Sequence, residues 1–340
     1  MYLSHNIVNQ LIKIEAGLVE LTAKDFNQKL QLKAVELKNI KSLFYFINSV
    51  GIEITLKDAE RLNVNKKIET QDLRGELIDN YRNTVTLVTN LAAQKSLILD
   101  TAKLLEINAT LAAKTVEDWK FKYREEGETF AMVYDDLLEL AKNPNATPEI
   151  ETLTVKILND YYGYNSLNRF YKLSLLVQSL LQIQPFIAYN KYTIALITDL
   201  LLSQEINIQD NIFNIMEFFI TKQSDIKRAF NNEVQANIEV AWHELFLGFF
   251  ANTIEELLVE LEKSNDNKSK LNKPFLDLNR RQLRILKYLQ TIHSLKREDY
   301  VQMMDVSTMT AYRDLQGLVD YKLIKTMGIG RGTKYVLSSR

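Results

Sequence analysis

The chain has 340 residues, of which 46% are hydrophobic and 25% are charged, a composition that suits buried cores and is typical of neither disordered nor membrane proteins. It contains no cysteine, which excludes disulfides, thiol catalysis and cysteine-based metal sites. Its three histidines do not have metal-ligand spacing, so we expect no metal and no cofactor.

The first predicted elements are helices. Residues 5–20 have an amphipathic pattern with charged residues inside it, so they are not expected to be a secretory signal. The most apolar stretch, residues 173–202, is interrupted by Gln, Asn, Lys and Asp side chains, which indicates a buried pair of helices and not a membrane span. We therefore expect a cytoplasmic protein that has no membrane partner.

Most of the chain is predicted to be helical. Gly and Pro number only 10 and 4, and long stretches carry apolar residues at helical spacing. We expect an N-terminal helical region over residues 1–95, a helical core over 96–262, a polar linker over 263–275 and a small module over 276–340. The net charge of -1 is divided unevenly, because residues 276–340 have a net charge of +6 and the rest has -7. This asymmetry favours a nucleic-acid contact confined to the module.

The module has the element order of a winged helix-turn-helix. Asn279 is placed to cap a helix over residues 280–291, and further helices are predicted over 297–304 and 308–322. Strands over 323–327 and 333–337 enclose a glycine-rich turn. Three helices followed by a hairpin are the parts of a winged helix.

The third helix of the module predicts contact with double-stranded DNA. Its first turns offer short hydroxyls and one guanidinium, which suit the major groove, while Met309, Tyr312, Leu315 and Leu318 are expected to face inward. Cations on the hairpin are expected to reach phosphates or the minor groove. The expected DNA-contacting residues are Ser307, Thr308, Thr310, Arg313, Lys325, Arg331 and Lys334. A winged helix that packs against another protein is the alternative.

These residues resemble the winged-helix module of DeoR-type regulators. The resemblance rests on the patterns Thr310-x-x-Arg313-x-Leu315-x-x-Leu318 and Gly330-Arg331-Gly332-Thr333-Lys334-Tyr335. It implies a DNA-binding fold at the C-terminal end of the chain.

Residues 184–192 resemble the signature loop of the Fic (filamentation-induced-by-cAMP) family, whose members transfer AMP from ATP to hydroxyl side chains. The family pattern is His-Pro-Phe-x-Asp/Glu-Gly-Asn-Gly/Lys-Arg, between two buried helices. Here Pro185, Phe186, Asn190 and Lys191 match it. An ordinary turn between two helices of an unrelated bundle is the alternative.

Four positions of that pattern carry other residues. Gln184 lacks the titratable group of the family's histidine, the general base, and Ala188 offers no oxygen to magnesium. Tyr189 replaces the glycine that lets backbone amides approach phosphate, and Tyr192 replaces the arginine that neutralises phosphate charge. The resemblance therefore implies a domain that has lost the machinery for AMP transfer.

Three other segments support this resemblance. Ser49-Val50-Gly51-Ile52-Glu53 is similar to the family's inhibitory motif Ser/Thr-x-x-x-Glu-Gly/Asn, whose glutamate pairs with the signature arginine, a position held here by Tyr192. Residues 122–124 resemble the segment near the target-docking flap, although a charged, solvated surface accounts for them as well. Trp242-x-x-Leu245-Phe246-Leu247-x-x-Phe250 resembles the helix after the core, where His243 is expected to be structural.

Together these patterns predict an all-α, Fic-like helical bundle followed by a winged helix-turn-helix. We expect a DNA-binding transcriptional regulator or an interaction protein, with double-stranded DNA as its partner and a homodimer as its arrangement. One alternative is a Fic-type adenylyltransferase with an atypical active site, in which Asn190, Lys191 and Glu53 hold a nucleotide. Another is a non-catalytic pocket in which ATP or another nucleotide alters DNA affinity.

Overall fold

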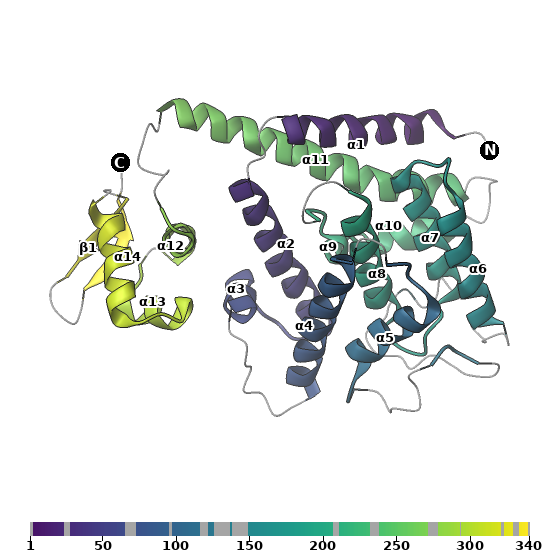
Figure 1. Cartoon of the computed structure of the whole chain (residues 1–340), viewed down its shortest axis with the longest axis horizontal. Coiled ribbons are helices and arrows are strands. Elements are labelled where there is room, and N and C mark those ends of the chain that lie inside the picture. Colours follow the sequence, from purple (N-terminus) through teal and green to yellow (C-terminus); the bar gives the residue numbers. More distant parts are fainter. Residues whose placement is uncertain are drawn as a thin grey trace. The chain divides into compact units, whose positions relative to one another are not determined.

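A computed structural model describes residues 3–23, 28–64, 73–94, 97–115, 122–125, 137, 149–206, 211–231, 238–270, 278–292, 294–320, 323–328 and 333–338. The chain divides into two compact units, Met1–Leu261 and Glu262–Arg340 (Figure 1). The first unit is helical and the second adds a two-stranded hairpin to its helices, which confirms the predicted fold class.

The first unit is built from a succession of helices. They are α1 (His5–Ala23), α2 (Gln28–Ser49), α3 (Leu56–Val64), α4 (Leu73–Ala92), α5 (Thr101–Ala112), α6 (Ile150–Gly163), α7 (Arg169–Ile183), α8 (Asn190–Glu205), α9 (Ile215–Thr221), α10 (Gln223–Asn231) and α11 (Ile238–Lys270), which continues into the second unit.

Helix α8 lies at the centre of this unit. It packs against α4, α5, α7 and α9, and most of its residues are buried. A helix that is covered on all sides needs apolar residues around its whole circumference, and the buried apolar residues of α8 are distributed in this way. Among the helices that the structure describes, none is both long and apolar enough to cross a membrane.

Helices α1 and α11 run side by side along one edge of the first unit (Figure 1). The amide of Gln10 donates to the carbonyl oxygen of Glu244 at 3.0 Å, and Ser4 Oγ donates to the Glu244 carboxylate at 2.9 Å. A side chain at Gly17 would collide with Ile254, so glycine permits this close approach.

Helix α11 extends further than the sequence pattern indicates. Residues 263–270, expected to belong to the linker, form its last turns. This run is polar but contains neither glycine nor proline, and the first breaker after it is Pro274. Polar side chains alone therefore do not end the helix.

The second unit confirms the predicted order of elements. Its helices are α12 (Arg280–Ile292), α13 (Arg297–Met304) and α14 (Thr308–Asp320), and its strands are β1 (Ile324–Met327) and β2 (Lys334–Leu337). The strands are antiparallel, with Lys325 opposite Val336. A short bridge between Leu295 and Tyr335 ties the segment before α13 to β2. The core contains buried residues from all five elements and from the segments that join them, including Ile285, Leu289, Tyr300, Ala311, Leu315, Leu318, Ile324 and Tyr335.

Candidate functional site

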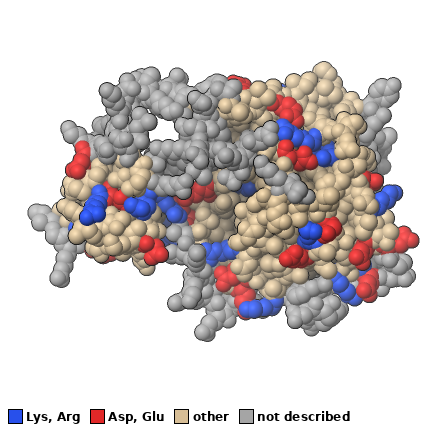
Figure 2. Space-filling view, viewed as in Figure 1, with Lys and Arg blue, Asp and Glu red and all other residues tan. Residues whose placement is uncertain are grey.

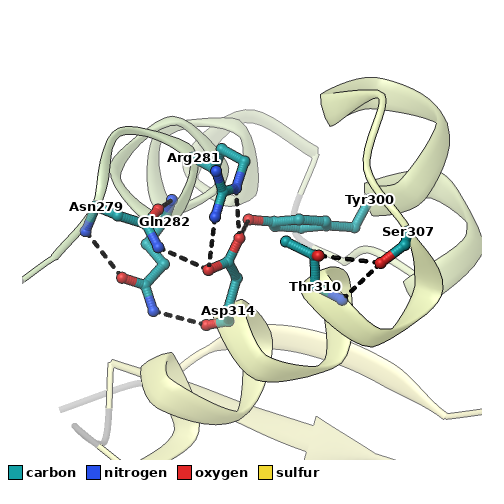
Figure 3. A network of polar contacts seen from close by, with 7 residues as sticks. All are labelled: Asn279, Arg281, Gln282, Tyr300, Ser307, Thr310 and Asp314. Carbon is teal, nitrogen blue, oxygen red and sulfur yellow. Dashed lines mark hydrogen bonds and ion pairs between the residues drawn. The ribbon is translucent and has the colours of Figure 1, made fainter.

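A buried carboxylate anchors α14, the predicted recognition helix (Figure 3). Asp314 is only 5% exposed. Arg281 Nε donates to Asp314 Oδ2 at 2.6 Å, and the hydroxyl of Tyr300 donates to the same oxygen at 2.9 Å. Asn279 Nδ2 donates to Oδ1 at 2.6 Å. Since these donors come from the start of α12 and from α13, Asp314 joins the three helices of the unit.

The charge of Asp314 is stabilised by these donors. Burial alone would raise its pKa, but hydrogen bonds from Arg281, Asn279 and Tyr300 outweigh burial and hold the pKa below its usual range. Conversely, burial and the hydrogen bond to Asp314 raise the pKa of Tyr300. At neutral pH the network therefore consists of an ionised carboxylate, a protonated phenol and a guanidinium.

Gln282 makes a second connection between α12 and α14. Its backbone N–H donates to Asn279 Oδ1 at 2.9 Å, and the backbone N–H of Asn279 donates to Gln282 Oε1 at 2.9 Å, so Asn279 caps α12 as predicted. Gln282 Nε2 also donates to the carbonyl oxygen of Asp314 at 2.9 Å. A Cβ atom at Gly317 would lie 2.8 Å from this amide nitrogen, so glycine leaves room for the contact.

Two of the predicted DNA-contacting hydroxyls form the start of α14. Ser307 Oγ accepts a hydrogen bond from the backbone N–H of Thr310 at 3.2 Å and lies 3.0 Å from Thr310 Oγ1 (Figure 3). This arrangement is an N-cap. Ser307 is exposed to solvent, as are Thr308 and Arg313, whereas Thr310 is half-buried.

The inward face of α14 differs from the predicted one. Leu315 and Leu318 are buried as expected, but Met309 and Tyr312 are 62% and 45% exposed. The prediction for Met309 and Tyr312 is wrong because the buried stripe runs through Ala311, Asp314, Leu315 and Leu318. On a helix with this stripe, position 309 lies on the opposite side and position 312 lies at the edge of the stripe. The outer side of α14 is therefore partly apolar.

The hairpin contributes exposed cations. Lys325 on β1 and Lys334 on β2 are both exposed, whereas Arg331 lies outside the described residues. Figure 2 shows several Lys and Arg side chains on the visible face of the C-terminal unit, with Asp and Glu side chains among them. The second unit thus offers positive charge from its hairpin as well as from α14.

In the first unit, the Fic-like loop joins α7 to α8 and is closed by Asn190. Its Nδ2 donates to the carbonyl oxygen of Phe186 at 2.7 Å, and the backbone N–H of Phe186 donates to its Oδ1 at 2.9 Å. Gln184 and Tyr189, which flank the loop, have left-handed φ angles of 44° and 58°. Gln184 is fully buried, and its Nε2 donates to the carbonyl oxygens of Leu181 and Leu137 at 2.8 and 3.3 Å.

Arg124 fastens the outer side of this loop. It is 2% exposed, and it donates from Nε to the carbonyl oxygen of Gln184 and from Nη2 to that of Ile183, at 2.8 and 2.9 Å. Its backbone N–H donates to the carbonyl oxygen of Pro185 at 2.9 Å. A solvated surface is therefore a wrong account of Arg124. Its neighbour Tyr123 stacks on Phe186, with ring centroids 5.4 Å apart.

Two tyrosines occupy the inner side of the loop. Tyr189 and Tyr192 are 1% and 0% exposed, and the hydroxyl of Tyr189 donates to Thr115 Oγ1 at 3.1 Å. Lys191 is also fully buried, with its Nζ 4.8 Å from the ring centroid of Tyr192. Asn108 Nδ2 donates to the carbonyl oxygen of Ala188 at 2.9 Å. The hydroxyl of Tyr189 and the carbonyl of Ala188 thus form hydrogen bonds with other parts of the same unit.

The motif at the end of α2 meets the loop through one of its two expected residues. The hydroxyls of Ser49 and Tyr192 lie 3.0 Å apart, so the inhibitory-like motif does contact the position of the family arginine. Glu53 is exposed in the segment after α2. The structure therefore brings Ser49, but not Glu53, into the contacts of the buried loop.

His243 and Trp242 fasten α11 to α7. His243 is 1% exposed, its Nδ1 lies 2.7 Å from Ser174 Oγ, and burial lowers its pKa to about 4. Trp242 Nε1 donates to the carbonyl oxygen of Ser174 at 2.9 Å. Within the part of the chain that the structure describes, no three His, Asp or Glu side chains gather as a metal site requires.

Comparison with known proteins assigns both parts of the chain to known folds. Residues 281–329 match the model of a family described as a DeoR-like helix-turn-helix domain. The whole chain is similar to the crystal structure of a Fic family protein from Desulfovibrio desulfuricans, with a TM-score of 0.57 and 14% identity over 100% of this chain and 98% of that one.

A Fic domain containing signaling protein from Bacteroides thetaiotaomicron is similar as well. Its TM-score is 0.52, at 13% identity, over 74% of this chain and 98% of that one. A search of curated proteins finds no match. At such low identities the likeness to solved structures concerns the fold. The chain thus has a Fic-like fold and carries a DeoR-like helix-turn-helix domain near its C-terminal end.

Proposed function

We propose that this protein is a transcriptional regulator that binds double-stranded DNA through its second unit. The observation that carries the proposal is the contrast between the two sides of α14. Asp314 is held on the inner side by donors from the start of α12 and from α13, while Thr308 and Arg313 face solvent. A rigidly held helix with an exposed polar side suits insertion into a major groove. The match to a DeoR-like helix-turn-helix domain supports the same function.

Each exposed group has a matching feature on DNA. The guanidinium of Arg313 suits bidentate contact with the O6 and N7 atoms of a guanine. Lys325 and Lys334 suit phosphate oxygens, which fix the position of the protein along the duplex. A homodimer would place two copies of α14 on two half-sites and so increase both affinity and specificity.

We further propose that the Fic-like body does not transfer AMP. Gln184 has no titratable group, and its amide already donates to two backbone carbonyls. Ala188 offers no side-chain oxygen, and its carbonyl accepts from Asn108. The buried rings of Tyr189 and Tyr192 lie where the family pattern has glycine and arginine. The loop thus lacks a general base, a magnesium ligand and a cation at the arginine position.

DNA binding is tested by fluorescence anisotropy with labelled genomic fragments. We expect binding that weakens linearly in log salt, because cations on the protein displace condensed counterions. Arg313→Ala should cost about 1–3 kcal/mol of binding free energy if Arg313 contacts a base. The matched control is Arg228→Ala, which removes an exposed arginine from α10 of the body and should leave binding unchanged. A wild-type protein without salt-sensitive binding would refute the proposal.

The absence of AMP transfer is tested with labelled ATP and magnesium. We expect no label on the protein itself or on added proteins, and no release of pyrophosphate. Label that is incorporated by the wild type and lost in Asn190→Ala would overturn this part of the proposal and favour an adenylyltransferase with unusual chemistry.

A further inference from the structure

The outer side of α14 carries two large, exposed side chains with apolar surface, Met309 and Tyr312. They are 62% and 45% exposed, and Met309 lies opposite the buried stripe of the helix. Residues three apart are neighbours on a helix surface, so the two side chains form one patch. Because this patch lies between Thr308 and Arg313 in the sequence, it occupies the same turns as the exposed polar groups.

Tyr312 is held in place by a residue of another helix. The guanidinium carbon of Arg297, at the start of α13, lies 5.5 Å from the ring centroid of Tyr312. A cation over an aromatic ring is an attractive arrangement that favours one orientation of the ring. The apolar patch therefore has a positively charged margin, formed by Arg297 on one side and Arg313 on the other.

A patch of this kind matches a thymine in the major groove. Thymine is the base that presents a methyl group there, and apolar side chains recognise it by contact. The cationic margin and the net charge of +6 of residues 276–340 fit a polyanion better than an apolar protein surface. The unbranched thioether of Met309 adapts readily to the shape of such a partner.

We infer that Met309 contacts the C5 methyl group of a thymine, with the Tyr312 ring as the wall of that contact. This inference rests on the proposed DNA binding. Met309 and Arg313 are four residues apart, which is about 6 Å along a helix. Because base pairs are spaced by about 3.4 Å, the thymine lies one or two base pairs from the base that Arg313 contacts.

The test starts from duplexes selected from a random pool by the full-length wild-type protein. Each thymine of the selected site is then replaced, one at a time, by uracil, which removes the methyl group and leaves the base pairing unchanged. We expect one replacement near the centre of each half-site to weaken binding about fivefold, as for an apolar contact in the major groove. We expect Met309→Ala to weaken binding to the thymine site by a similar factor and to be insensitive to that replacement.

The control is Leu37→Ala, which removes an exposed apolar side chain from α2 of the body. It should keep both the affinity and the preference for thymine over uracil. If the wild type binds no duplex, the proposed function fails and this inference fails with it. Two outcomes would overturn the role of Met309 and leave DNA binding intact. In one, the wild type binds every uracil-substituted site as well as the parent thymine site. In the other, Met309→Ala still prefers thymine over uracil.

Discussion

Two helix starts in this molecule share a local backbone feature and have opposite surroundings. Both α8 and α14 begin shortly after a residue with a left-handed backbone, Tyr189 with φ of 58° and Asp305 with φ of 48°. The first residues of α8, Asn190 to Tyr192, are completely buried, whereas Thr308 and Met309 at the start of α14 are exposed. The polar start of a helix is available to a ligand only where the rest of the fold leaves it uncovered.

The two regions also use buried polar groups in different ways. In the Fic-like loop, the side chains of Gln184 and Asn190 bond to the loop's own backbone and that of its neighbours, so they stabilise the loop itself. In the second unit, Asp314 accepts from side chains outside its helix and thereby fixes the opposite, solvent-facing side. A buried network supports recognition only when it leaves a neighbouring surface free.

The largest effect is expected from removing the anchor of α14. Asp314→Ala leaves the donors of Arg281, Asn279 and Tyr300 without their acceptor and should destabilise the second unit by about 3–4 kcal/mol, because several hydrogen bonds, one of them to a buried phenol, are lost together. Both tryptophans, at positions 119 and 242, belong to the first unit. Urea titration should therefore show an earlier loss of circular dichroism and an unchanged tryptophan transition.

The control for this variant is Asp320→Ala at the exposed end of α14, which should change the unfolding free energy of the unit by less than about 0.5 kcal/mol. If Asp314→Ala lowered the unfolding free energy of the second unit no more than Asp320→Ala does, the Asp314 network would not be what holds the helices together.

A smaller effect is expected from opening the Fic-like loop. Asn190→Ala leaves the buried N–H and carbonyl of Phe186 without partners and should cost the first unit about 2–3 kcal/mol. Tryptophan fluorescence during urea unfolding measures this, with Asn165→Ala in the exposed turn before α7 as the matched control. A variant as stable as the wild type would contradict the view that Asn190 serves the fold of the loop.

The body should also lose stability in mild acid because of one histidine. Burial lowers the pKa of His243 to about 4, so the unfolded chain accepts a proton that the folded state resists. This contribution is fully present above the unfolded pKa and is lost as the pH falls from about 6.5 towards 4, which amounts to about 2 kcal/mol between pH 7 and pH 5.

His243→Asn keeps a polar group next to Ser174 but cannot titrate in this range. Urea unfolding at several pH values should therefore give a steeper decrease in stability for the wild type than for the variant. Because all other titrating groups are common to both proteins, parallel pH profiles would show that His243 is accessible to protons in the folded state.

Local sequence patterns predict the helices and strands of the second unit well, but they predict the buried face of α14 badly. Asn279 marks the start of α12 and the turn at residues 305–307 marks the end of α13, and the predicted bounds of these two helices agree with the structure to within a residue. Met309 and Tyr312 were expected in the core because they are apolar, and the burial of Asp314 depends on Arg281 and Tyr300, which lie 33 and 14 residues away. A helical pattern contains no information about such distant donors.

The same limit applies to the Fic-like loop. Its place between two apolar helices follows from Pro185 and the residues around it. Its contact with Ser49 joins residues that are 143 positions apart in the sequence, and its contact with Arg124 joins residues that are 60 positions apart. Both contacts therefore arise only from tertiary packing. The four residues that differ from the family pattern could therefore be recognised from the sequence alone, whereas the contacts that cover the loop could not.

The smallest effect concerns the folding role of the apolar patch on α14. Met309 is 62% exposed, so Met309→Ala should change the unfolding free energy of the second unit by no more than about 0.5 kcal/mol. Leu318→Ala, at a fully buried position of the same helix, should cost about 2–4 kcal/mol in the same circular dichroism experiment. If Met309→Ala destabilised the unit as much as Leu318→Ala, Met309 would belong to the core. The start of α14 would then be covered at this residue, as the start of α8 is.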